Sequence, residues 1–185
     1  MKRRLFIAIS LPEDVKKEIR YALDRIDPEI FLTGREVREE HWHITLNFLG
    51  EQDEEKIPKI ISIVKEVARG GVYAKTSLTL KHIDFESPDK RMVWVHGDKS
   101  SSEALGKIKE YISHRLSDQH VHGSNDFEKF IMHITLMRFP RRPHKDMRIH
   151  EELGISFHIE EINLMESELF PEGPEYTIIH SEKFL

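Results

Sequence analysis

Residues 43–46 read HITL, and the same four letters return at residues 133–136, 90 positions further along a chain of 185 residues. Each copy lies in an apolar run and contains a His and a Thr two positions apart. Side chains at i and i+2 of a β-strand point to the same side. Each copy would therefore present one imidazole and one hydroxyl on one face, and two such strands side by side would surround a small ligand with both pairs.

The alternation around the first copy sorts its neighbours into a polar face and a core face. The polar face would contain His41, His43, Thr45 and Asn47. The core face would contain Trp42, Ile44, Leu46 and Phe48. Around the second copy, the polar face would contain His133, Thr135 and Met137, and the core face Met132, Ile134 and Leu136. A sheet face that carries His and Thr packs poorly in a core, so both polar faces are expected to line a cleft.

Two imidazoles can divide acid–base chemistry because each changes charge near neutral pH. A neutral His accepts a proton from a nucleophile and a protonated His donates one to a leaving oxygen, each role accelerating a reaction by about 10²–10⁴-fold. The two Thr hydroxyls can hydrogen-bond phosphate oxygens. The pattern therefore favours opening of a strained cyclic phosphodiester by water, with His43 and His133 as catalytic residues and Thr45 and Thr135 as phosphate ligands. It does not decide which His is the acid.

Arg138 follows the second copy and is a further candidate for binding phosphate, because a guanidinium stabilises developing negative charge. Its position has the opposite parity to that of His133 and Thr135. Arg138 would reach their face only if the strand ended, twisted or bulged after Leu136.

The remaining hydrophobic pattern predicts alternating strands and helices without a linker long enough to separate independent domains, so residues 1–185 are expected to form one domain, or two small lobes that share one core. Strands are predicted at residues 5–9, 42–49, 77–85, 92–96, 130–139, 155–169 and 176–184. Helices are predicted at residues 12–26, 53–67 and 101–116, the last capped by Ser101 or Ser102.

Composition narrows the class of protein. The chain has no Cys, hence no disulfide, thiol nucleophile or thiolate metal site. The net charge of −5 argues against a broad non-specific nucleic-acid surface. The basic residues that follow the second motif could bind an anion or form a solvated loop. No apolar run is long enough for a membrane span, and the basic start of the chain is interpreted as a strand rather than a signal peptide. We expect a cytoplasmic monomer.

Several further segments accompany the two motifs. They are residues 4–9 (RLFIAI) with 11–12 (LP), residues 48–50 (FLG), Arg138, residues 166–169 (ESEL), Pro171, Gly173 and Tyr176. With these segments the chain resembles the two-histidine (2H) phosphoesterases, specifically the RNA 2′,3′-cyclic phosphodiesterase family, also called the 2′-5′ RNA ligase family. The similarity extends over nearly the whole chain.

The resemblance implies an α+β bilobal fold in which two antiparallel β-sheets face a central cleft, with helices packed outside and pseudo-twofold symmetry. It implies hydrolysis of a ribose 2′,3′-cyclic phosphate, on RNA 3′ ends or small nucleotides, to a 2′-phosphomonoester. By the same resemblance His43 is the proton donor, His133 the proton acceptor, and Thr45, Thr135 and Arg138 bind the phosphate. No metal and no cofactor are expected, although His41, His43 and His133 could supply three nitrogens to zinc.

Two other functions remain open. Microscopic reversibility would let the same histidines join RNA ends through a 2′-5′ linkage. A non-catalytic module could use the same cleft to bind a nucleotide or an RNA end, but such a module has no need for two titrating imidazoles.

Overall fold

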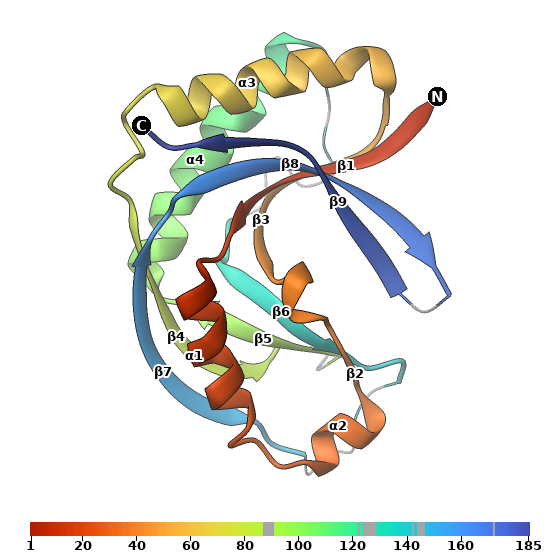
Figure 1. Cartoon of the computed structure of the whole chain (residues 1–185), viewed down its shortest axis with the longest axis vertical. Helices are drawn as coiled ribbons and strands as arrows, with labels where there is room; N and C mark the ends of the chain where they lie inside the picture. Colours follow the sequence, from red (N-terminus) through yellow and green to blue (C-terminus); the bar gives the residue numbers. More distant parts are fainter. Residues whose placement is uncertain (87–90, 122, 124–128, 142, 144–146, 172) are drawn as a thin grey trace.

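The computed structural model describes residues 1–86, 91–121, 123, 129–141, 143, 147–171 and 173–185. The turn expected at residues 87–90, and residues 142 and 144–146 of the basic segment, lie outside this part of the chain. The described strands form two antiparallel sheets with helices packed against them, so the predicted α+β class is confirmed (Figure 1).

The first sheet has the strand order β3-β1-β8-β9. Its strands are β1 (Lys2–Ser10), β3 (His43–Asp53), β8 (Glu161–Phe170) and β9 (Gly173–Lys183). The central strand β1 is apolar on both faces. Leu5, Ile7 and Ile9 lie in the main core, whereas Phe6 and Ala8 form a separate small cluster with Met165 on the opposite face.

The second sheet has the order β2-β6-β5-β4-β7. Its strands are β2 (Arg35–Glu36), β4 (Ser77–Phe85), β5 (Met92–Gly97), β6 (His133–Arg138) and β7 (His150–His158). Val93 and Val95 of β5 lie in the main core beside Ile134 and Leu136 of β6. The polar residues that alternate with them lie on the other face of the sheet.

Helices cover the core faces of both sheets. They are α1 (Glu13–Leu23), α2 (Glu29–Thr33), α3 (Ile57–Arg69) and α4 (Lys99–Asp118), with short 3-10 turns η1 (Glu39–His41) and η2 (Glu54–Lys56). Helix α3 packs on β8 and β9, α4 packs on β3 and β4, and α1 packs on β7. Figure 1 shows α3 across one end of the molecule and α1 beside the curved strand β7. Among the described residues, no helix is long and apolar enough to cross a membrane.

Two predictions of secondary structure were wrong in detail. The single strand expected at residues 155–169 is two strands, β7 and β8, which belong to different sheets, so the chain crosses between sheets near Ile159. Helix α4 begins earlier than expected, and its cap is Asp98, whose carboxylate accepts a hydrogen bond from the Ser101 amide at 2.7 Å. An Asp at this position satisfies an amide that lacks a partner within the helix.

Candidate active site

The first motif strand contains a β-bulge at the last residue of HITL. Ala8 of β1 pairs with Thr45, but the next residue, Ile7, pairs with Asn47, so Leu46 is the extra residue. A bulge reverses the alternation beyond it. Asn47 is consequently buried at 1% exposure, and Phe48 lies on the same face as His43 with 43% of its surface exposed. The assignment of Asn47 to the polar face and of Phe48 to the core was therefore wrong.

The second motif strand contains a bulge at the equivalent position. Trp94 of β5 pairs with Thr135, whereas Val93 pairs with Met137, so Leu136 is extra. Met137 is buried in the core rather than on the polar face, which corrects its assignment. Arg138, paired with Met92, returns to the face of His133. The bulge that Arg138 required is present, and the pairing of β6 with β5 repeats that of β3 with β1.

The backbone holds both histidine rings in the same way. His43 Nδ1 lies 2.7 Å from the carbonyl oxygen of His41, and His133 Nδ1 lies 2.9 Å from that of Ile131. A carbonyl only accepts, so each Nδ1 donates, and in a neutral ring Nε2 is left as the acceptor. His43 Nε2 lies 3.0 Å from Thr45 Oγ1, which can donate to it.

The surroundings of the two rings differ. His43 packs against Phe6 and Tyr176, with ring centroids 5.0 and 5.2 Å away. His133 stacks on the indole of Trp94, with centroids 3.9 Å apart and planes inclined by 21°. The neighbouring strands explain the difference. In the second sheet, Trp94 of β5 pairs with Thr135, whereas in the first sheet Ala8 of β1 pairs with Thr45.

Burial controls the charge of both imidazoles. Desolvation lowers the pKa of His43 to about 4, the bond to the His41 carbonyl opposes this change, and the charges of His133 and Arg138 lower the pKa further. Desolvation also lowers the pKa of His133, the Ile131 carbonyl opposes it, and Arg138 adds to it. Both rings are therefore mainly neutral at pH 7 in the unliganded protein, and an anion between them would favour protonation.

Contact between β3 and β6, together with the action of His133 and Arg138 on His43, indicates that the structure brings the two motifs together. Thr45 and Thr135 lie half-buried on the same faces as their histidines. Arg138 is exposed, and its Nη1 contacts Met92 Sδ at 3.4 Å. Two surface hollows, beside α1 and β7 and between α3 and α4, contain none of these five residues.

Sequence reasoning missed three neighbours of the motifs. Phe6 and Tyr176 contact His43, and Trp94 contacts His133. For Trp94 a signal existed, because it alternates with Val93 and Val95 and so had to lie on the polar face. For Phe6 none existed, since β1 is apolar on both faces. In the described part of the chain, no group of three or more His, Asp or Glu is arranged to hold a metal ion.

Two antiparallel sheets that each contribute a bulged His-x-Thr strand define the class of two-histidine phosphoesterases. The family model described as LigT like phosphoesterase matches residues 9–91. An RNA 2′,3′-cyclic phosphodiesterase of Thermotoga maritima is 31% identical over 98% of this chain and 95% of its own length. An RNA 2′,3′-cyclic phosphodiesterase of Methanocaldococcus jannaschii is 28% identical over 95% of this chain and 98% of its own length. A crystal structure of a Thermus thermophilus protein superposes with a TM-score of 0.82 at 26% identity, over 98% of this chain and 97% of that one.

This chain belongs to the RNA 2′,3′-cyclic phosphodiesterase family. It is accordingly an enzyme of the phosphoric diester hydrolase class.

Proposed function

We propose that this enzyme opens the 2′,3′-cyclic phosphate of an RNA 3′ end or a small nucleotide to a 2′-phosphomonoester, without a metal ion. His133 takes a proton from water, whose oxygen forms a bond to phosphorus. His43 gives a proton to the 3′ oxygen as the P–O3′ bond breaks. The product retains its phosphate on the 2′ oxygen.

The matching arrangement of the two rings carries this proposal. Both Nδ1 atoms donate to a backbone carbonyl two residues earlier, which leaves the Nε2 atoms for the chemistry, that of His43 once substrate replaces its contact with Thr45 Oγ1. The phosphodiester brings one negative charge between the two rings, which raises the pKa of His43 from about 4 and so favours the protonated form that the acid role requires. Thr45, Thr135 and Arg138 would bind the phosphate oxygens.

The first test is incubation of adenosine 2′,3′-cyclic phosphate with the enzyme in excess EDTA, followed by separation of the 2′- and 3′-monophosphates. We expect the 2′ product, with turnover reduced by at least about 10²-fold in both His43→Ala and His133→Ala. The matched control is His158→Ala, an exposed position near the end of β7. Formation of the 3′ product, or activity that needs only one of the two histidines, would contradict the proposal.

A second substrate separates the two catalytic roles. When the bridging 3′ oxygen is replaced by sulfur, the leaving thiolate needs no proton. His43→Ala should then recover most of its lost activity, whereas His133→Ala should not. Recovery in His133→Ala instead would reverse the assignment of acid and base.

A further inference from the structure

The imidazole of His133 on β6 lies face to face with the indole of Trp94 on β5. The ring centroids are 3.9 Å apart and the planes are inclined by 21°. Trp94 pairs with Thr135, so the indole comes from the adjacent strand and stacks on the histidine two residues away. A cation over the face of an aromatic ring, within about 6 Å of its centroid, is attracted by the electrons of that ring. This geometry stabilises the imidazolium form of His133.

The equivalent place in the first sheet holds no aromatic ring, because Ala8 of β1 stands where β5 has Trp94. The rings that contact His43 come from other positions. The planes of Phe6 and Tyr176 are inclined to the imidazole by 34° and 89°, so neither ring lies parallel to it. Among the described residues, a stacked π face is thus present in the second sheet and absent from the first.

No acidic side chain supports a positive charge on His133 in the described part of the chain. Its Nδ1 donates to the carbonyl of Ile131, which is a neutral group. The charged and titratable groups around the ring are Arg138 on its own strand, His96 on β5 and His43 on the first sheet. Each of these groups is either neutral or repels a second positive charge. The indole is therefore the neighbour that can offset the burial of the imidazolium.

The indole also carries a penalty that a phenyl ring would not. Trp94 Nε1 is buried and has no hydrogen-bond partner among the described residues. An unpaired buried donor destabilises the folded protein, and Phe has no such donor. The polar atom therefore does not explain why Trp stands here. The π face does, because Trp attracts a cation more strongly than Phe or Tyr.

We propose that Trp94 is a positioning residue that makes His133 the base, because its indole fixes the imidazole and stabilises the imidazolium formed when the ring takes a proton from water. This inference rests on the proposed function. The lone pair of His133 Nε2 forms the new N–H bond, and the electrons of the broken O–H bond stay on the oxygen that attacks phosphorus. An imidazolium that is more stable at His133 than at His43 gives the two transfers their direction.

The direct test is an NMR titration of His133 without substrate in the wild type, Trp94→Leu and Trp94→Phe. Trp94→Leu should lower the pKa of His133 by about one unit, which corresponds to a tenfold loss of imidazolium stability. Trp94→Phe should lower the pKa by less, and it decides the question if the Leu variant does not fold.

The matched control is Val95→Ala, on the core face of the same strand, which should leave the pKa of His133 unchanged. A pKa that is unchanged or raised in both Trp94 variants would overturn the proposal, because water would then stabilise the imidazolium at least as well as the indole does.

Kinetics separate support of the base from a general loosening of the site. Because a weaker base accepts a proton less readily, Trp94→Leu should lower kcat for adenosine 2′,3′-cyclic phosphate by about three- to tenfold. Trp94→Phe should lose less, and KM should change by less than twofold in both. The loss should persist with the 3′-sulfur substrate, which removes the need for the acid but not for the base. Val95→Ala should retain kcat within twofold.

Two kinetic outcomes would contradict the role of Trp94. Equal losses in Trp94→Leu and Val95→Ala would show that packing alone matters, and a loss that disappears with the 3′-sulfur substrate would place the effect on the acid. If the wild type hydrolyses no cyclic phosphate, the proposed function fails, and stabilisation of the His133 imidazolium by Trp94 is judged by the titration alone.

Discussion

At the scale of single residues, His43 and His133 share a backbone arrangement but differ in what encloses them. Phe6 and Tyr176 surround the first ring, and Trp94 stacks on the second. Apolar surroundings disfavour the imidazolium form, which explains why both pKa values are lowered.

These shifts predict an acidic optimum for kcat/KM, which reports on the free enzyme. In the proposed mechanism the active form needs protonated His43, whose pKa is about 4, and neutral His133, whose pKa lies below its usual value. That form is most populated between the two values, so kcat/KM should follow a bell with its maximum below pH 6.5. Because bound phosphate raises the pKa of His43, the maximum of kcat should lie at higher pH. A pH–rate series at constant ionic strength checks this, and a kcat/KM maximum above pH 7 would contradict it.

The lowered pKa of His43 also predicts that the stability of the folded protein depends on pH. Its pKa is about 4 in the folded protein and 6.5 in the unfolded chain, so between these values the unfolded chain binds more protons. The free energy of unfolding should fall by at most about 3 kcal/mol from this residue as the pH drops from 6.5 to 4. Urea unfolding should show a weaker decline in His43→Gln than in the wild type.

The matched change His158→Gln, at an exposed position, should retain the wild-type decline. Identical pH dependence in His43→Gln and the wild type would show that His43 is not desolvated.

At the scale of secondary-structure elements, the bulge in β3 decides which side chains anchor the strand. Asn47 Nδ2 donates to Ser113 Oγ of α4 at 2.8 Å and lies 3.5 Å from the Lys109 carbonyl. Phe48 instead lies on the face of Phe6, His43 and Tyr176, with its ring centroid 6.3 Å from that of Phe6. The strand is thus attached to α4 through the residue that simple alternation places on the opposite face.

Paired substitutions at these neighbouring positions test the bulge. Asn47→Ala should lower the free energy of unfolding by about 1–3 kcal/mol, because it removes buried hydrogen bonds and opens space. Phe48→Ala should cost clearly less, since much of that ring is already exposed. Chemical denaturation measures both. The reverse order would indicate a strand without the bulge.

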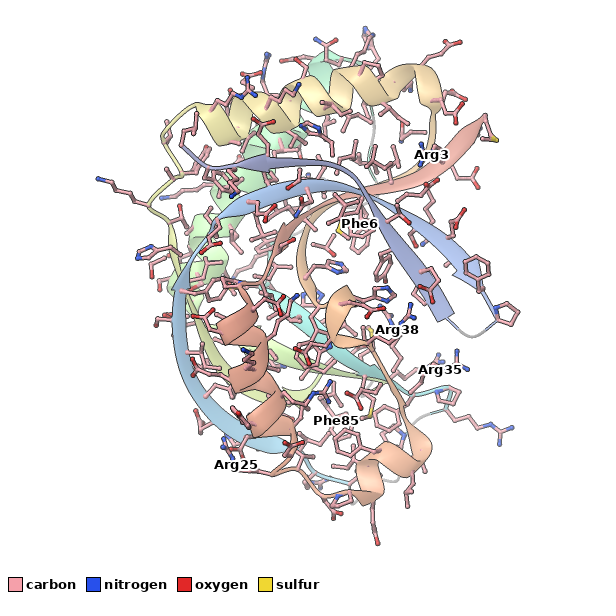
Figure 2. The ribbon with its side chains drawn as sticks, in the orientation of Figure 1. Arg3, Phe6, Arg25, Arg35, Arg38 and Phe85 are labelled. Atoms are coloured by element: carbon pink, nitrogen blue, oxygen red, sulfur yellow. The ribbon has the colours of Figure 1, made fainter. Side chains whose placement is uncertain are left out.

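At the scale of the whole molecule, the β8–β9 hairpin of the first sheet contacts β2 of the second sheet and the segment that connects β2 to β3. Arg38 forms an ion pair with Glu175, and Arg35 donates to the Pro171 carbonyl at 3.2 Å. Figure 2 shows Arg35 and Arg38 beside the tip of this hairpin. His41 Nε2 also lies 3.5 Å from Glu175 Oε2. The hairpin therefore contacts His41, whose carbonyl accepts the hydrogen bond from His43 Nδ1.

Removal of this contact should have a small effect on overall stability. The Arg38 and Glu175 side chains are 53% and 47% exposed, so water screens their attraction. Glu175→Gln should lower the free energy of unfolding by less than about 1 kcal/mol, with a smaller difference in high salt. Urea unfolding at two salt concentrations measures this. A loss above about 2 kcal/mol would mean that the hairpin is a main connection between the sheets.

The sequence by itself determined the sheet-rich α+β class, the two motif strands and the faces of His43, Thr45, His133 and Thr135, because strand alternation is a local property of the backbone. It indicated that Arg138 would reach the face of His133 only if the strand ended, twisted or bulged, but not which of these occurs. Only the tertiary structure decided the positions of Asn47, Phe48 and Met137, the separation of β7 from β8 into different sheets, and the aromatic neighbours of each histidine. Bulges, registers and crossings depend on which strand lies alongside, and pairings between residues distant in the chain leave no local pattern.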